Sequence, residues 1–180
     1  MTKLTHFDEY RDKYPNFKLE KTPENILLLQ MHTDGGELFF DWRAHDQLSD
    51  LFADISGDRE LSVIIYTGTG DTFIDKYGPL DPTRKLPAHK DYGAEPLEMK
   101  GFYGRTRHMN MLDIQVPIIA AVNGPCSIHS ELPIMCDIIL ASEDTYFQDS
   151  AHFPRGLVPG DGVHIAWPRA LGQNRARYFL

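Results

Sequence analysis

The 180-residue sequence has little of several features that would place it in a specialised class. Its two cysteines, Cys126 and Cys136, match neither a zinc site nor a disulfide framework, so we expect a reducing, cytoplasmic setting. The longest apolar run, at residues 116–122, is far too short to span a membrane. Residues 1–10 are polar and carry acids, so we expect no signal peptide.

An excess of basic residues is also missing. The chain has 18 Lys and Arg against 26 Asp and Glu, a net charge of −8, so we expect no nucleic-acid partner. Hydrophobic residues make up 42% and charged residues 24%, which are values of ordinary globular proteins and exclude a disordered chain or a fibre. We expect one core domain over residues 17–180, preceded by a polar and partly helical arm at residues 1–16.

Hydrophobic spacing predicts strands that alternate with helices. Short apolar runs predict buried strands at residues 26–29, 61–66, 117–122 and 137–141, and residues 17–20 are predicted to be the hairpin neighbour of the first. Helical spacing predicts helices at residues 44–55, 93–114, 162–170 and from 173 onward, with Leu97, Phe102, Met109 and Leu112 facing inward in the second. Residues 71–92 are expected to form a loop. This alternation is typical of an α/β fold with crossover connections.

Five ordered motifs carry a family resemblance. They are VIIYTGTGDTF (63–73), PIIAAVNG (117–124), MCDIILA (135–141), GLVPGDG (156–162) and RALG (169–172). Together they resemble the crotonase superfamily, which includes the enoyl-CoA hydratases and isomerases. The resemblance implies a spiral of ββα units that assembles as trimers or dimers of trimers. Because the sequence stops within a predicted helix, we expect the C-terminal helical region of this fold to be missing.

Two segments depart from the pattern of members that act on CoA esters. IDKYG (74–78) stands where those members have an Ala-Gly-Asp segment, and PCSIHS (125–130) stands where they have two or three glycines. Glycine lets a backbone N–H approach the thioester oxygen closely, so both halves of the usual oxyanion hole are put in question. Glu131 matches one hydratase glutamate, whereas the second falls at or next to His152.

The departures resemble one branch of the superfamily, the 6-oxocamphor hydrolases, which are β-diketone hydrolases. The matching segments are NGP (123–125) followed by His129, FQDSAHFP (147–154) and VPGDGVH (158–164). The branch implies hydrolysis of a small, cyclic 1,3-diketone to a keto acid, a retro-Claisen reaction. Neither of its steps needs a metal or a redox cofactor, and no cluster with the spacing of a metal site is visible in the sequence.

The resemblance assigns catalytic roles to three residues. His152 is the candidate general base, and Asp161, nine residues further on, is the candidate acid that orients it. His129 is the candidate donor to the enolate oxygen, with Glu131 either behind it or acting only as the first-turn acid of a short helix. The alternative is that His152 is a surface or core histidine, that Asp161 is a helix cap, and that His129 merely fills space.

Trp42 is the candidate residue for binding the substrate. The branch uses an indole N–H to hold a carbonyl oxygen, but an ungapped match places that tryptophan at Phe40. Residues two apart in a strand share a face, so Trp42 can still reach the site; an ordinary core position is the equal alternative. Tyr77 or Tyr103 could take its place as donor. His45, His108 and His164 are interpreted as structural.

Two other functions stay open at this point. A CoA-thioester hydratase or isomerase on the same fold is favoured by Glu131 and opposed by the missing glycines. A catalytically silent crotonase-like subunit is compatible with the expected loss of the C-terminal region.

Overall fold

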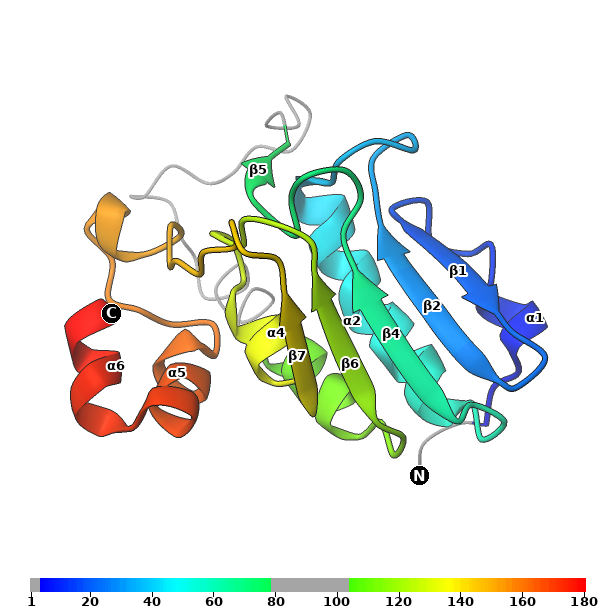
Figure 1. The fold of residues 1–180 in the computed structure, drawn as a ribbon. Helices are drawn as coiled ribbons and strands as arrows, with labels where there is room; N and C mark the ends of the chain where they lie inside the picture. The colour runs from blue at the N-terminus through cyan, green and yellow to red at the C-terminus, as the bar shows by residue number, and fades with distance from the viewer. Residues whose placement is uncertain (1–3, 79–103) are drawn as a thin grey trace, which may run out of the picture.

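The computed structural model describes residues 4–78 and 104–180, and its centre is a five-stranded sheet (Figure 1). The strands lie side by side in the order β1 (Phe17–Lys21), β2 (Ile26–Met31), β4 (Val63–Thr67), β6 (Ile118–Val122) and β7 (Ile138–Ala141). β1 and β2 pair antiparallel, and the other neighbours pair parallel. The five strands expected from the sequence are therefore confirmed, as is the α/β class.

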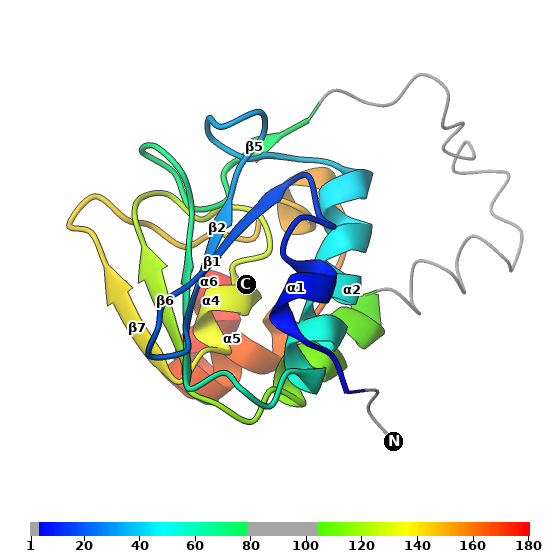
Figure 2. The ribbon, with the colours of Figure 1, turned by 90° about the vertical axis from the view of Figure 1, so that its right-hand side faces the viewer.

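Helix α2 (Trp42–Gly57) covers one face of this sheet (Figure 2). The carboxylate of Asp41 caps it by accepting a hydrogen bond of 2.8 Å from the backbone N–H of Ala44. Its buried apolar residues are Ala44, Leu48, Leu51, Phe52 and Ile55. This is the face that the spacing predicted, and burial of each large side chain contributes about 1.5–3 kcal/mol. The helix begins two residues earlier than expected, which places Trp42 in its first turn.

Shorter elements complete the described chain. They are α1 (Phe7–Tyr10), β3 (Phe39–Phe40), β5 (Lys76–Tyr77), α4 (Glu131–Ile134), the 3₁₀ turn η1 (Phe153–Arg155), α5 (Val163–Leu171) and α6 (Gln173–Phe179). β3 and β5 pair as a second, parallel sheet. The predictions of α5 and α6 are confirmed, whereas β3, β5 and α4 escaped prediction because two to four residues carry no periodicity.

A further helix at residues 104–112 confirms part of the helix predicted at 93–114. Its inward face was predicted wrongly: Met109 and Leu112 are 44% and 61% exposed, whereas Arg107 and Met111 are 0% and 3% exposed. The helix turns the polar side chain of Arg107 inward because the buried carboxylate of Glu131 faces it. Leu97, Phe102 and most of the predicted loop at 71–92 lie outside the described residues.

Two glycines allow the loops that follow β4 and β6 to touch. A Cβ on Gly68 would lie 2.3 Å from the carbonyl oxygen of Thr72, and a Cβ on Gly124 would lie 2.0 Å from that of Asp71. The side chain of Asn123 joins the loops by accepting a hydrogen bond of 3.0 Å from the N–H of Gly68. The GTG and NG motifs thus hold the carboxyl ends of two central strands together.

Replacing Gly124 by alanine is expected to lower the free energy of unfolding by about 2–3 kcal/mol, because the new methyl group would meet backbone atoms that cannot move aside independently. Gly36→Ala is the matched control, since its Cβ would lie 3.7 Å from its nearest neighbour, the carbonyl oxygen of Thr33. Urea unfolding of both variants gives the comparison. Equal unfolding midpoints would contradict this account of the loops.

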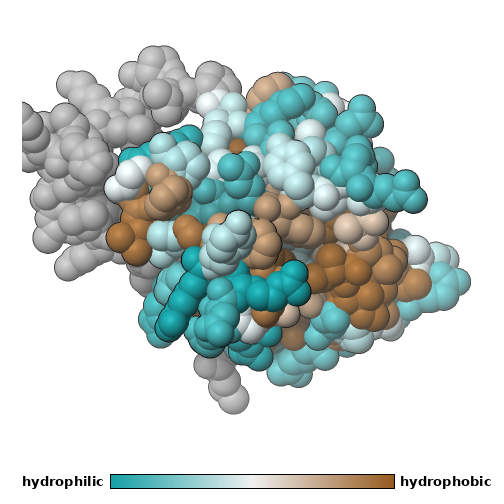
Figure 3. All heavy atoms as spheres, turned by 60° about the vertical axis from the view of Figure 1, so that its left-hand side comes forward, coloured by the Kyte–Doolittle hydropathy of each residue, from teal (hydrophilic) through white to brown (hydrophobic). Residues whose placement is uncertain are grey.

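Exposed apolar side chains gather on the side of the molecule shown in Figure 3. On β7, the edge strand, Ile138, Ile139 and Leu140 are 50%, 42% and 61% exposed. The strand at residues 137–141 was wrongly predicted to be buried, because β7 lies at the edge of the sheet with its apolar side chains exposed. None of the helices in residues 4–78 and 104–180 has the length and apolar character needed to cross a membrane.

Candidate active site

The catalytic candidates lie beyond the carboxyl ends of β6 and β7. His129 stands in the loop between β6 and α4, His152 stands between β7 and η1, and Asp161 comes just before α5. Sheets of parallel strands bind ligands at this end, where the loops that follow neighbouring strands meet. The fold therefore gathers the three predicted residues at one end of the sheet.

Glu131, the first residue of α4, is the centre of a buried polar cluster. Its side chain is fully buried. Its Oε1 lies 2.7 Å from Nδ1 of His129, 3.2 Å from Nε2 of His108 and 3.6 Å from Nη2 of Arg107. Glu131 is thus the partner of His129, and the alternative that it acts only as the first-turn acid of a short helix was wrong. Arg107 was missed because a buried arginine has no hydrophobic signal.

The charges of this cluster fix the form of the His129 ring. Burial, reinforced by Arg107, lowers the pKa of His129 to about 4 although Glu131 acts in the opposite direction. Burial alone would raise the pKa of Glu131, but His129, His108 and Arg107 outweigh it and hold that pKa below its ordinary value. At neutral pH the ring is therefore uncharged and the carboxylate is ionised. Nδ1 faces both the carboxylate of Glu131, at 2.7 Å, and Nη2 of Arg107, at 3.2 Å, and the shorter, charge-assisted contact favours an N–H on Nδ1 that donates a hydrogen bond to Glu131 and leaves the lone pair on Nε2.

Acidification is expected to destabilise the protein through His129. Its pKa is about 4 in the folded state and 6.5 in the unfolded state, so the unfolded state binds more protons between these values. The free energy of unfolding should therefore fall by about 2–3 kcal/mol from pH 7 to pH 4.5. His45, whose pKa burial also lowers, acts in the same direction. Urea unfolding at a series of pH values measures this slope.

His129→Asn is the control for this slope, because asparagine tolerates the left-handed backbone of this position (φ 49°). The variant should show a clearly shallower dependence on pH. An unchanged slope would contradict the assignment of the titration to His129.

His152 lies between two carboxylates. Its Nδ1 is 2.7 Å from Oδ1 of Asp149, and its Nε2 is 3.5 Å from Oδ2 of Asp161. The side chain of His152 is 12% exposed, that of Asp149 is 7% exposed and that of Asp161 is 34% exposed. The expected proximity of His152 and Asp161 is therefore present, but the shorter contact is made by Asp149. Sequence reasoning missed Asp149, although it stands three residues before His152.

The segment Gly160-Asp161-Gly162 connects His152 to the cluster around Glu131. A Cβ on Gly160 would lie 3.3 Å from Nε2 of His152, and a Cβ on Gly162 would lie 2.7 Å from Nε2 of His108. Asp161, between them, has a left-handed backbone with φ 46°. Backbone strain of this kind costs about 1–3 kcal/mol and concentrates at functional sites. Both glycines therefore make room for imidazole rings on either side of Asp161.

Aromatic rings also lie against the ring of His129. The ring centroid of Phe40 lies 4.9 Å from that of His129, and the centroid of His45 lies 5.7 Å from it. The ring of Trp42 is 5.5 Å from that of His45. Trp42 stands at the start of α2 and not on the strand with Phe40, so the argument that these two residues share a strand face was wrong. The indole is nevertheless one ring away from His129.

The two tyrosines considered in place of Trp42 have different outcomes. Tyr77 lies in β5 and is 41% exposed, with the guanidinium of Arg155 4.5 Å from its ring centroid. Tyr103 lies outside the described residues. The choice of a carbonyl donor therefore stays a prediction.

Comparison with known proteins identifies the family. The family model described as enoyl-CoA hydratase/isomerase matches residues 22–180. The chain belongs to this family. A curated relative, a probable peroxisomal enoyl-CoA hydratase of Arabidopsis thaliana, is 30% identical over 135 residues, which cover 72% of this chain and 45% of the relative. The chain thus spans about half the length of the curated relatives it matches.

Solved structures support the crotonase fold. A β-diketone hydrolase from the cyanobacterium Anabaena sp. PCC 7120, bound to (S)-3-oxocyclohexyl acetic acid, is 43% identical, with a TM-score of 0.87 over 96% of this chain and 66% of that chain. An enoyl-CoA hydratase from Bacillus anthracis is 20% identical, with a TM-score of 0.70 over 91% of this chain and 61% of that chain, and shows the fold alone.

The loop that departs from the CoA-ester members of the family is held by internal hydrogen bonds. The backbone N–H groups of Ser127 and Ile128 both donate to the carbonyl oxygen of Ile74, at 3.0 and 3.1 Å. The N–H of Phe73 donates to the carbonyl oxygen of Pro125 at 3.0 Å. The N–H groups of Ser127 and Ile128 thus join the two departing segments to each other. They are therefore not available to a thioester oxygen.

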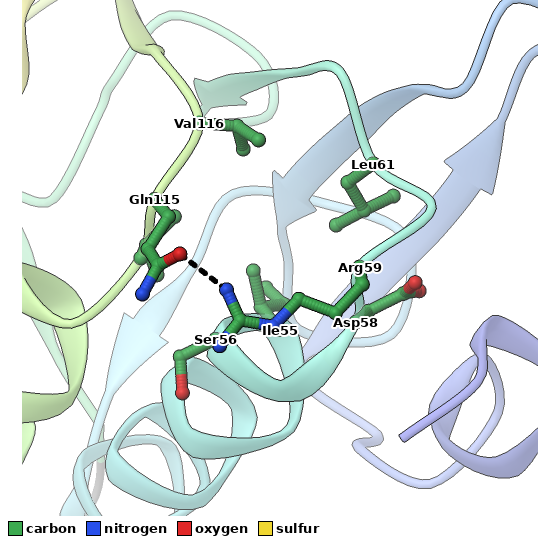
Figure 4. Close-up of a pocket in the computed structure, with 8 residues that line it drawn as sticks. Ile55, Ser56, Asp58, Arg59, Leu61, Gln115 and Val116 are labelled. Carbon is green, nitrogen blue, oxygen red and sulfur yellow. Dashed lines mark hydrogen bonds between the residues drawn. The ribbon is translucent and has the colours of Figure 1, made fainter. Parts of the chain in front are cut away.

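Figure 4 shows a small depression of about 210 Å³ that none of the catalytic candidates lines. Leu61 and Val116, which precede β4 and β6, place it at the opposite ends of the strands. Arg59 crosses it and donates a hydrogen bond to the side chain of Gln115.

No three His, Cys, Asp or Glu side chains in residues 4–78 and 104–180 are grouped so that they could hold a metal ion.

Proposed function

We propose that this protein is a β-diketone hydrolase, which cleaves a cyclic 1,3-diketone to a keto acid by retro-Claisen hydrolysis. The observation that carries the proposal is His152, an imidazole held by carboxylates at the place where the resemblance puts a hydratase glutamate. The 43% identity to the Anabaena β-diketone hydrolase supports it. The molecule bound to that relative is itself a keto acid, the class of product that this reaction forms.

The first step adds water to one carbonyl carbon. Nε2 of His152 takes a proton from the water, and the oxygen of the water forms a bond to the carbon, which becomes tetrahedral. The bond between this carbon and the central carbon of the diketone then breaks. Its electron pair moves toward the second carbonyl group and forms an enolate. The proton held by His152 returns to the central carbon, and the products are a ketone and a carboxylic acid within one molecule.

His129 is proposed to act on the enolate oxygen. In its neutral form its N–H is directed to Glu131, so Nε2 must first take a proton from the solvent before it can donate a hydrogen bond to the enolate oxygen. Burial and Arg107 oppose this protonation in the resting site. The negative charge of an enolate next to Nε2 favours it. His129 would therefore stabilise the enolate as that charge develops, while Trp42 would hold a substrate carbonyl.

A CoA-thioester hydratase is the second candidate, because the Arabidopsis relative is described as a probable enoyl-CoA hydratase and Glu131 matches a hydratase glutamate. Two observations count against it. The carboxylate of Glu131 is fully buried and directed to two histidines and an arginine. The N–H groups of Ser127 and Ile128 are directed to Ile74. A hydratase needs the corresponding groups to face its substrate.

Incubation with monocyclic and bicyclic β-diketones tests the proposal, with a short enoyl-CoA as the comparison. We expect a keto acid to form from at least one diketone and no hydration of the enoyl-CoA. Hydration of the enoyl-CoA without diketone cleavage would favour the second candidate. No turnover of either substrate by the folded protein would favour a catalytically silent subunit.

We also propose that the protein forms a homo-oligomer, a trimer or a dimer of trimers, and that it is located in the cytoplasm.

A further inference from the structure

The two carboxylates beside His152 differ in the ring nitrogen they face. Asp149 faces Nδ1 at 2.7 Å, a distance typical of a charge-assisted hydrogen bond. Asp161 faces Nε2 at 3.5 Å, which is too long for a good hydrogen bond. A neutral imidazole has one N–H, and the shorter contact to an acceptor decides where it lies. The proton therefore belongs on Nδ1, and the lone pair belongs on Nε2.

We propose that Asp149 is the positioning residue of His152, a role that the resemblance gave to Asp161, and that Asp161 instead holds the attacking water. This inference rests on the proposed function and deepens it. A carboxylate at Nδ1 selects the tautomer whose Nε2 accepts a proton, and it stabilises the imidazolium that forms. Asp161, on the accepting side of the ring, has the place from which a carboxylate can orient water toward Nε2.

The backbone around Asp149 is suited to a positioning role, because hydrogen bonds fix it on both sides. The N–H of Gln148 donates to the carbonyl oxygen of Cys126 at 3.1 Å. The N–H and hydroxyl of Ser150 both donate to the carbonyl oxygen of Ser127, at 3.0 and 2.6 Å. These contacts join the Asp149 segment to the loop that carries His129. A catalytic group needs such a rigid support.

The backbone of His152 is held as firmly. Its carbonyl oxygen accepts hydrogen bonds from the N–H groups of Arg155 and Leu157, at 2.8 and 3.1 Å. The ring therefore has little freedom at either end, because the backbone is fixed by η1 and Nδ1 is fixed by Asp149. Only the side of Nε2, next to Gly160 and Asp161, remains for the reaction.

The geometry also fits a water held by two acceptors. Nε2 of His152 and Oδ2 of Asp161 are 3.5 Å apart, so one water oxygen beside them can lie about 2.8 Å from both. Such a water donates one hydrogen to each. One O–H bond breaks as its proton passes to Nε2, and the electron pair left on oxygen forms the bond to the carbonyl carbon. The new imidazolium then has a carboxylate on each side.

Nitrogen-15 NMR of the histidine rings tests this inference without relying on turnover. The signal of His152 is assigned by its loss in His152→Gln. We expect the neutral wild-type ring to carry its proton on Nδ1, and the neutral ring in Asp149→Asn to carry it on Nε2, because the amide NH₂ can donate to Nδ1. In the same variant kcat for diketone cleavage should fall by about 10²–10³-fold with little change in KM.

Asp144→Asn is the matched control, because Asp144 is an exposed residue between β7 and Asp149. It should leave the His152 tautomer unchanged and keep kcat within about twofold. A wild-type ring protonated on Nε2, or an Asp149→Asn variant that behaves like Asp144→Asn, would overturn the inference. If no diketone is cleaved but the wild-type tautomer is as expected, the proposed function fails and the role of Asp149 in positioning the ring stands.

Discussion

Replacing His152 by alanine is expected to lower kcat for diketone cleavage by about 10³–10⁴-fold, because the change removes the only group proposed to take the proton from water. KM should change little, since His129 and the rings of Phe40, Trp42 and His45 near it remain in place. The side chain is 12% exposed and lies at the end of the sheet, so the variant should fold. Steady-state kinetics with the best diketone substrate measures the effect.

His164→Ala is the control for this experiment. His164 is an exposed residue of α5 that was interpreted as structural, and its removal should leave kcat close to the wild-type value. If His152→Ala retains wild-type turnover, the mechanism proposed for this site is wrong, whatever the substrate proves to be.

Replacing Glu131 by glutamine is expected to lower the free energy of unfolding by about 3–5 kcal/mol, since it leaves the fully buried Arg107 without its carboxylate. Glutamine has nearly the same shape, so the loss reports the charge and not the packing. The low pKa of Glu131 means that this contribution is complete above pH 4.5 and is lost at lower pH, as the carboxylate binds a proton. Unfolding in urea at pH 7 measures the difference.

Glu60→Gln is the matched control, because Glu60 forms an exposed ion pair with Lys21 at 2.9 Å. Its removal should barely shift the unfolding midpoint. If Glu131→Gln were as stable as Glu60→Gln, the buried cluster would not depend on this charge. A stable Glu131→Gln variant that loses hydration of an enoyl-CoA would make Glu131 a catalytic acid or base, as the second candidate function requires.

Most of the strands could be predicted because they are short apolar runs, and α2 could be predicted because its buried residues follow the helical period. Leu27 and Leu29 alternate with half-buried neighbours in β2, and Leu48, Leu51, Phe52 and Ile55 recur on one face of α2. The helix at residues 104–112 does not follow this rule. It turns Arg107 inward because a buried carboxylate needs a counter-charge, and a method that looks for hydrophobic faces selects Met109 and Leu112 instead.

The candidate site could be predicted only in part. The resemblance selected His129, His152 and Asp161, and the fold gathers them at one end of the sheet. Asp149 was missed because a short Asp-x-x-His segment outside a helix has no recognisable pattern; its contact depends on how the turn before η1 folds. The position of Trp42 was misjudged because the strand β3 ends at Phe40, and a capping aspartate, Asp41, starts α2 immediately.

Hydrolysis of a β-diketone in water enriched in oxygen-18 tests the central claim most directly. Water is proposed to attack one ketone carbon, so mass spectrometry should find a keto acid with one heavy oxygen in its carboxyl group. His152→Ala should form this product about 10³–10⁴-fold more slowly. Absence of a labelled keto acid with every cyclic 1,3-diketone tried, together with oxygen-18 in a hydrated enoyl-CoA, would contradict the account.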